Sequence, residues 1–276
     1  MRTFWGVVLL IAMEQPGIAE GVDFSGDFGA GGGYADNLNH AGSDSLKEGS
    51  GFSSLWVMAG LRGGIRMGGR YYLSSRYDGT FYESFSDLTV NGLTIEAGLL
   101  YPVTDKVRVR ISPAAGVRFY DDEDRDSRVY SVLLSARDQV FERLAVRAEY
   151  RYTNNDADLS VYSYGAHRLS AEVEAEVFSG GYLTFGYSAE FSQNNFYTLA
   201  TTPVSGNMHG RRSSNLFGPG QEVYRTDTTA HTLLMGLDQE LYKKIYLQLG
   251  YSFSSVQSDP GDYTEQFFSG GIGYRY

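Results

Sequence analysis

The chain has 276 residues, a formal charge of −10 and no cysteine. The negative charge disfavours nucleic acid as a partner. The lack of cysteine excludes disulfides, thiolate metal sites and cysteine nucleophiles. Mean hydropathy is −0.29, and no internal apolar run approaches the roughly 18 to 20 residues that a membrane helix needs. A helical membrane protein is therefore excluded, whereas 34 glycines together with 14% aromatic residues are typical of a glycine-rich sheet with aromatic belts.

The first nineteen residues have the composition of a secretory signal peptide. Met1 and Arg2 form a short positive region, residues 4–13 form an apolar segment of about ten residues, and Pro16 precedes the small residues Gly17 and Ala19. We expect cleavage after Ala19, which leaves 20–276 as a single domain. The alternative is a buried N-terminal helix, because the segment is too short to span a bilayer.

Residues 106–120, KVRVRISPAAGVRFY, show the pattern that organises the rest of the chain. Odd positions such as Val109 and Ile111 are apolar, while Lys106, Arg108 and Arg110 occupy even positions. Side chains alternate between the two faces of a strand, so this segment separates an apolar surface from a basic one. Because the pattern recurs throughout a helix-poor chain, we expect the apolar face to contact lipid and the basic face to line a lumen.

Alternating segments of this kind follow one another along the chain. They predict an all-β, transmembrane, up-and-down antiparallel barrel of about twelve strands, with ten or fourteen as alternatives. The expected strands are residues 22–34, 52–61, 65–77, 93–99, 106–120, 130–136, 144–152, 168–177, 183–191, 229–237, 245–253 and 263–276.

Three connections carry specific expectations. The sequence Arg62-Gly63-Gly64 predicts a tight turn that leads directly into the third strand, with Ile65 and Met67 facing outward. Pro113 predicts a bulge, since proline removes a ladder hydrogen bond. Residues 192–228 lack sustained alternation and are predicted to form the longest extracellular loop.

The last nine residues, FSGGIGYRY, form an amphipathic strand that ends on an aromatic residue. In this respect the chain resembles bacterial outer-membrane β-barrel proteins, whose terminal strand is read by the barrel-assembly machinery. The resemblance implies a Gram-negative outer membrane, contact with bilayer lipid and lipopolysaccharide, and an assembly signal at Phe268, Tyr274 and Tyr276. It identifies no subfamily, so no functional residue and no cofactor is carried over.

Charged residues of the inward parity are the candidate functional residues. The predicted lining consists of Arg66, Arg70, Arg76, Arg108, Arg110, Arg118, Arg147, Arg151, Glu172, Glu174 and Glu176, with Lys106, Glu96 and Glu149 among them. Opposite charges on different parts of one wall would produce a transverse field across a water-filled lumen. The planar guanidinium group suits carboxylates and phosphates, which points to a narrow passive channel for small anionic solutes such as acidic sugars.

Other functions are open at this stage. In a narrow barrel the same arginines and glutamates could neutralise one another and fill the interior, leaving a non-conducting anchor or a subunit of an envelope assembly such as polysaccharide export. A barrel hydrolase would need a histidine near a nucleophile, but His167 and Ser170 have opposite parity, and only His209 with Asp227 could meet at the rim.

Two further groups of residues have surface roles. The loop clusters are expected to be solvated charge, with weak Ca²⁺ binding or cation-bridged contact with lipopolysaccharide as the alternative; they are Asp121, Asp122, Glu123 and Asp124, and Asn154, Asn155, Asp156 and Asp158. An interfacial aromatic girdle is expected from Tyr71, Tyr101, Tyr130, Tyr150, Tyr152 and Tyr251.

Overall fold

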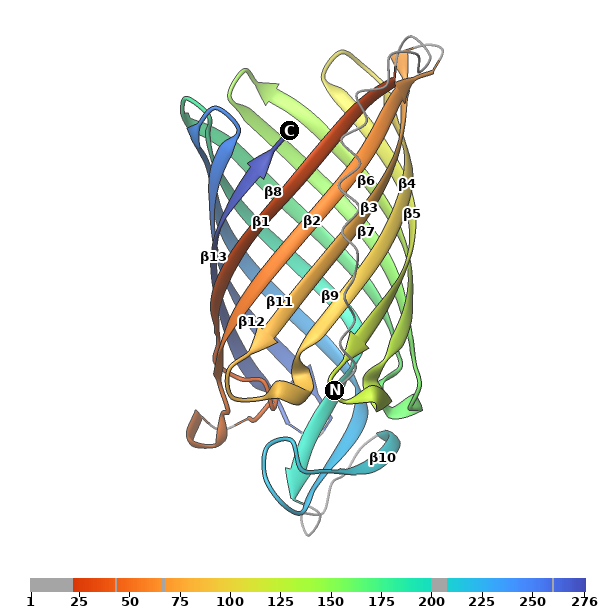
Figure 1. Ribbon diagram of the computed structural model, residues 1–276, viewed down its shortest axis with the longest axis vertical. Coiled ribbons are helices and arrows are strands. Elements are labelled where there is room, and N and C mark those ends of the chain that lie inside the picture. Colours follow the sequence, from red (N-terminus) through yellow and green to blue (C-terminus); the bar gives the residue numbers. More distant parts are fainter. Residues whose placement is uncertain (1–21, 43, 66–67, 200–207, 260) are drawn as a thin grey trace.

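The computed structural model describes residues 22–276 except 43, 66–67, 200–207 and 260, and it is a closed antiparallel β-barrel (Figure 1). The predicted signal peptide and Arg66 lie outside the described residues. Within the described part of the chain, no helix is long and apolar enough to cross a membrane.

Thirteen strands are present among the described residues, and twelve of them form the wall. Their bounds are β1 Val22–Ala35, β2 Ser50–Gly64, β3 Arg70–Tyr82, β4 Val90–Pro102, β5 Val107–Tyr120, β6 Ser127–Phe141, β7 Leu144–Ala157, β8 Tyr164–Phe178, β9 Gly181–Leu199, β10 Met208–Ser214, β11 Gln221–Tyr242, β12 Ile245–Ser258 and β13 Tyr263–Arg275. Strands adjacent in the chain pair with one another, except that β9 pairs with β11, and β1 pairs with β13 to close the barrel. The predicted fold class and the count of twelve are confirmed, and the alternatives of ten and fourteen strands are excluded.

The two ends of the barrel differ in their connections. At one end, which we call the short-turn end, β4–β5, β6–β7, β8–β9 and β11–β12 are joined by two to four residues. The opposite end, the long-loop end, carries the 3-10 helices η1 Asp44–Leu46, η3 Ser86–Leu88, η4 Glu123–Arg125 and η5 Ser160–Tyr162. This asymmetry of short turns and longer loops is the one expected of a transmembrane barrel.

Alternation places apolar side chains on the outside of the wall. On β5, Ile111 and Phe119 are exposed by 45% and 55%, whereas Ser112 between them is exposed by 1%. The same alternation continues on β9, where Phe185, Tyr187 and Phe191 are all exposed. An exposed apolar surface of this extent would not be tolerated in water, and its natural partner is the hydrocarbon of a bilayer.

The six girdle tyrosines all lie on this outer face. Tyr71 and Tyr101 lie near the short-turn end, and Tyr130 and Tyr152 lie near the long-loop end. These four lie toward the two margins of the apolar surface, as expected of interfacial aromatic residues, whereas Tyr150 and Tyr251 lie near the middle of β7 and β12.

The predicted bulge at Pro113 is wrong. The register of β5 with β6 runs without a shift from Val107 to Arg118, with Pro113 opposite Val132. On the other side, the register with β4 is the same before and after the proline. Pro113 has outward parity and is exposed, so the strand tolerates the missing N–H donor without inserting a residue.

Two connections also differ from expectation. Strand β2 continues through Gly64, β3 begins only at Arg70, and Ile65 therefore lies in the turn and not in a strand; Met67 lies outside the described residues. Residues 192–199 and 221–228, predicted as loop, continue β9 and β11. These two strands extend past the wall, and β10 pairs with β11 (Figure 1).

Candidate functional site

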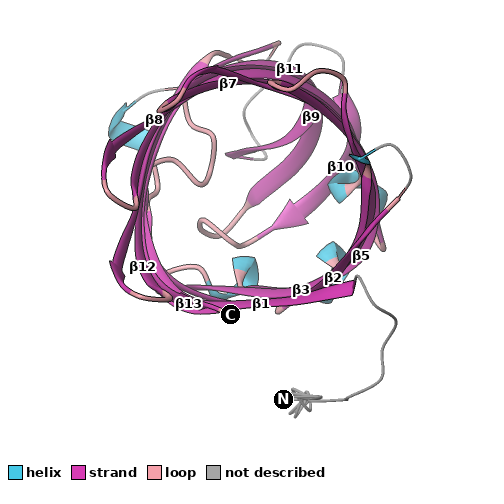
Figure 2. Ribbon diagram, turned by 90° about the horizontal axis from the view of Figure 1, so that it is seen from above, coloured by secondary structure: helices cyan, strands magenta, loops and turns pink. Residues whose placement is uncertain are grey.

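The extension is formed by residues 192–199 and 208–228, which comprise the ends of β9 and β11 together with β10, and it lies over the long-loop end. Viewed along the barrel axis, part of it falls inside the outline of the wall (Figure 2). Its Tyr197 and Val223 form a buried cluster with Val161 and Tyr162 of η5, which belongs to the β7–β8 loop. The extension is therefore packed against other loops of the barrel by a small apolar core of its own.

Arg125 of η4 is the polar centre of this packing. Its side chain is 10% exposed; one nitrogen donates to the Tyr197 hydroxyl, another lies 3.4 Å from Asp122, and the guanidinium lies 4.4 Å from the ring centroid of Tyr162. Burial raises the pKa of the Tyr197 hydroxyl to about 12, so it stays protonated at neutral pH. Arg212 of β10 adds an ion pair with Asp124.

The first loop of the chain contacts the same extension. His40 Nδ1 lies 2.5 Å from the backbone oxygen of Asn195, and its ring stacks on Tyr263 with centroids 4.9 Å apart. Burial lowers the pKa of His40, and the positive charge of Arg125 acts in the same direction.

The acidic cluster in the β5–β6 loop was predicted to be solvated. Two of its members, Asp122 and Asp124, instead form ion pairs with Arg125 and Arg212.

Inside the barrel, the structure places the described candidate residues on the face opposite the exposed apolar side chains. Arg70 and Arg76 are on β3, with the remaining arginines on β5 and β7 and the glutamates on β8. Tyr72 shares the parity of Arg70 and Arg76, and Leu73, on the other face, is exposed by 43%. Arg66 lies outside the described residues, so its predicted place in the lining stays a prediction.

Many of the interior charges are paired. Arg147 lies 3.7 Å from Glu172 and 3.8 Å from Glu149. Arg137 of β6, which the sequence reading missed, donates to Glu174 at 2.8 Å. Glu172 and Glu174 of β8 therefore neutralise arginines on β7 and β6, which reduces the transverse separation of charge expected from the sequence.

A second interior cluster surrounds Glu96 on β4. Its Oε1 accepts hydrogen bonds from Arg110 and from the hydroxyl of Tyr72, and the guanidinium of Arg110 lies 4.9 Å from the centroid of the Tyr72 ring. Arg110 Nε also donates to Ser112 Oγ at 2.7 Å. A Cβ on Gly98 would lie 2.3 Å from the Tyr72 ring, so glycine at this position lets the ring lie along the wall.

Four of the predicted arginines are not paired in this way. Among the described residues, no carboxylate lies within 4.0 Å of the guanidinium groups of Arg70, Arg108, Arg118 and Arg151. Arg118 instead donates to the Tyr164 hydroxyl at 3.3 Å. These four residues are the interior cations whose charge is left over after local pairing.

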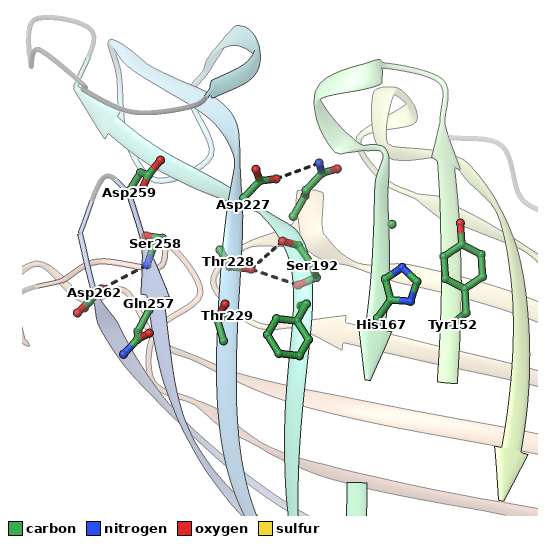
Figure 3. A pocket seen from close by; sticks show the side chains of 13 residues that line it. Tyr152, His167, Ser192, Asp227, Thr228, Thr229, Gln257, Ser258, Asp259 and Asp262 are labelled. Carbon is green, nitrogen blue, oxygen red and sulfur yellow. Dashed lines mark hydrogen bonds between the residues drawn. The ribbon is translucent and has the colours of Figure 1, made fainter. Parts of the chain in front are cut away.

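The outer margin of the long-loop end carries a groove of about 790 Å³ (Figure 3). Tyr152, His167 and Phe191 lie side by side along one part of it on β7, β8 and β9. Gln193 donates to Asp227 at 3.0 Å at the rim. These residues have outward parity, so the groove belongs to the outer surface and not to the interior.

The geometry of the histidines bears on hydrolase chemistry. His167 faces outward, where its Nδ1 lies 2.9 Å from the hydroxyl of Tyr150, while Ser170 has inward parity. The opposite parity of His167 and Ser170 expected from the sequence is thus observed. His209 pairs with Arg225 through its backbone, and its side chain lies outside the described residues. Within the described part of the chain, no group of three or more His, Asp or Glu could hold a metal ion.

The three predicted assembly-signal residues lie on or beyond β13. Phe268 is exposed and its ring centroid lies 4.7 Å from that of Tyr251, and Tyr274 lies 5.5 Å from Phe28. Tyr276 is 72% exposed and pairs with Gly26 through its backbone. Their recognition by assembly machinery stays a prediction.

The fold defined by these features is that of outer-membrane β-barrel proteins. An outer-membrane channel from Pseudomonas putida F1 superposes with a TM-score of 0.53 at 10% identity, covering 96% of this chain and 98% of that one. The KdgM porin and an anion-selective porin from Comamonas acidovorans give TM-scores of 0.45 at 12% and 9% identity, covering 90% and 92% of this chain and 98% and 99% of theirs. No family model and no curated protein sequence matches the chain. At these identities the likeness concerns the fold alone.

Proposed function

We propose that this protein resides in a Gram-negative outer membrane, in contact with bilayer lipid and lipopolysaccharide, and conducts small anionic solutes passively. The apolar outer face and the asymmetry of short turns and long loops support the membrane location. The observation that carries the solute preference is the set of four interior arginines without a carboxylate partner, which are Arg70, Arg108, Arg118 and Arg151.

The remaining charges determine how strong the preference is. Arg110, Arg137 and Arg147 are each within ion-pair distance of a glutamate, so their positive charge is largely cancelled at a distance. Unpaired guanidinium groups that line a narrow aqueous passage attract anions into it and repel cations. We therefore expect a modest anion preference and not an exclusive one.

Conductance in planar bilayers tests this function. Purified protein inserted into a bilayer should give discrete current steps, and under a salt gradient its reversal potential should have the sign of anion selectivity. Protein shown to be inserted that produces no current steps would refute the proposal.

The second candidate is a non-conducting barrel that serves as an anchor or envelope-assembly subunit. It is favoured by the extension, which is fixed over the long-loop end by Arg125, His40 and the buried cluster around Tyr197. A variant lacking residues 200–220 separates the cases. If the wild type is silent and the variant conducts, the extension closes a passage, and if both are silent, the barrel is an anchor.

We do not propose a hydrolase, because His167 and Ser170 lie on opposite faces of the wall. His167 contacts the Tyr150 hydroxyl on the outer surface, where it packs beside the ring of Tyr152. Its place among these aromatic residues needs no catalytic role.

A further inference from the structure

A separate cavity of about 360 Å³ lies inside the barrel, between β1, β2, β3, β12 and β13. Its lining combines one indole ring, two guanidinium groups, the carboxylate of Asp27 and several uncharged polar groups. The lining residues that matter here are Trp56, Arg76, Tyr246, Gln248, Ser269 and Arg275. Of these six residues, only Arg76 was predicted from the sequence to line the interior.

Trp56 lies along the wall and does not stand out from it. A Cβ on Gly29, its partner on β1, would lie 2.2 Å from Cζ2 of the indole, and a Cβ on Gly271 of β13 would lie 3.0 Å from Cη2. The ring therefore reaches across β1 toward β13 over two glycines. Because one face of the indole covers the glycine backbone, the opposite face is directed into the cavity.

Asp27 fixes the aromatic part of the site. Its Oδ1 accepts hydrogen bonds from Trp56 Nε1 and from the Tyr246 hydroxyl, both at 2.6 Å, and its side chain is only 10% exposed. Its Oδ2 lies 3.3 Å from Arg275 Nε, and the Arg275 guanidinium lies 4.5 Å from the Tyr246 ring centroid. A single buried carboxylate thus orients two rings and one guanidinium group, which is the preorganisation that a binding site needs.

Two positive charges, Arg76 and Arg275, face the cavity, and each also contacts a carboxylate of the wall. Arg76 lies 3.7 Å from Asp78, and both side chains are about half exposed, so this pair is weak and well solvated. Arg275 is 58% exposed, although Asp27 lies 3.3 Å and Asp238 lies 3.9 Å from its guanidinium nitrogens. Guanidinium nitrogens that remain accessible in this way are suited to a carboxylate guest, which they bind in a planar, two-pronged geometry.

The uncharged polar residues decide what kind of carboxylate fits. Gln248 and Ser269 supply donors and acceptors beside the indole. A sugar ring presents a C–H face that stacks on an aromatic ring and hydroxyl groups that bond to such side chains, whereas an unsubstituted aromatic acid offers no partner to them. The volume is near the lower end of the roughly 300–1,000 Å³ range of small-molecule sites, which suits a single ring and not a chain of several.

We propose that this cavity is a binding site for one sugar-acid ring, with the ring stacked on Trp56 and its carboxylate held by Arg76 and Arg275. The proposal rests on the proposed function, because it names the class of anion that the interior takes. The interior would then contain one specific binding site, in addition to a wall whose charge attracts anions without specificity.

Tryptophan fluorescence gives a direct measurement. The sequence has two tryptophans, Trp5 and Trp56, and Trp5 lies in the predicted signal peptide. Protein expressed with Trp5→Phe therefore reports on Trp56 alone, whether or not that segment is cleaved. Titration with glucuronate should change the emission of Trp56 in a saturable manner. Glucose, which differs from glucuronate by lacking the carboxylate, should bind at least tenfold more weakly, and benzoate should also bind more weakly than glucuronate.

Substitutions identify the residues involved. Arg76→Gln should weaken glucuronate binding at least tenfold, while Arg128→Gln, which removes an exposed arginine of outward parity on β6, should leave it unchanged. The site assignment is overturned if glucuronate and glucose titrate alike, if benzoate binds more tightly, if Arg76→Gln has no effect, or if emission does not respond at all. A protein that conducts anions but fails this titration refutes only the binding site, whereas a protein without conductance refutes the proposed function.

Discussion

Arg125 holds the extension over the long-loop end, and its removal should release the extension. Arg125→Ala removes the donor to the Tyr197 hydroxyl, the contact with Asp122 and the cation–π contact with Tyr162. A hydrogen bond to a charged group contributes roughly 1.5–3 kcal/mol, and leaving its buried partner unsatisfied adds to the loss. We take about 2 kcal/mol as the change in the free energy of local opening, which corresponds to an increase of about 30-fold in the open population.

Limited trypsin digestion measures that population. Arg211 and Arg212 lie in β10, where pairing with β11 protects them. When opening is fast relative to cleavage, the cleavage rate follows the open population, so mass spectrometry should show cleavage after Arg211 or Arg212 rising by about 30-fold in Arg125→Ala. Arg128→Ala, an exposed arginine on the neighbouring strand, is the matched control and should cleave at the wild-type rate. Equal rates for Arg125→Ala and the wild type would show that Arg125 does not hold the extension.

Two further predictions concern pH and packing. His40 is buried in its neutral form with a pKa below the ordinary value of 6.5, so the unfolded loop binds more protons than the folded one as pH falls. The stabilising contribution of neutral His40 is therefore present above about pH 6.5 and lost progressively below it. Hydrogen exchange at residues 192–199, corrected for intrinsic rates, should accelerate at pH 5, and His40→Gln should remove this pH dependence. If the variant keeps the same pH dependence, another group is responsible for it. Gly98→Ala should lower the free energy of unfolding by about 1–3 kcal/mol because its Cβ would overlap the Tyr72 ring, while Gly64→Ala, which has open space, should be neutral in the same urea titration; equal stability of both variants would contradict the observed packing of Tyr72.

The wall of the barrel follows closely from the sequence because one physical rule acts on every strand. A strand with lipid on one side and an aqueous interior on the other must alternate, and residues 106–120 already state this alternation. The parity of Arg110 and Ile111 is correct for the same reason. Pro113 was misjudged because a proline with its ring toward the outside costs one hydrogen bond but does not require an inserted residue.

The extension could not be predicted by that rule. Residues 192–199 and 221–228 lie past the wall, where neither lipid nor the interior imposes a period of two, and Tyr197 and Val223 are instead buried against η5. Their apolar partners lie in the β7–β8 loop, more than thirty residues away in the chain, and Arg125, which donates to Tyr197, lies in the β5–β6 loop. Pairing of this kind depends on tertiary contacts that local sequence does not encode.

The interior clusters were predictable in parity but not in partnership. Asp27 and Trp56 have the inward parity, yet the signal that joins them is glycine at positions such as Gly29 and Gly271, which lets the indole lie flat. Arg137 was missed because β6 alternates weakly in sequence. The leftover charge on Arg70 and Arg108 emerges only once the carboxylate partners of the other arginines are known.

The reversal potential under a potassium chloride gradient tests the central claim most directly. The wild type should show anion selectivity, and the combined variant Arg70→Gln, Arg108→Gln, Arg151→Gln should shift the reversal potential toward cation selectivity. Arg128→Gln removes an arginine on the outer face and should leave the reversal potential unchanged. A wild-type protein that conducts with no anion preference, or a combined variant with an unchanged reversal potential, would contradict the account.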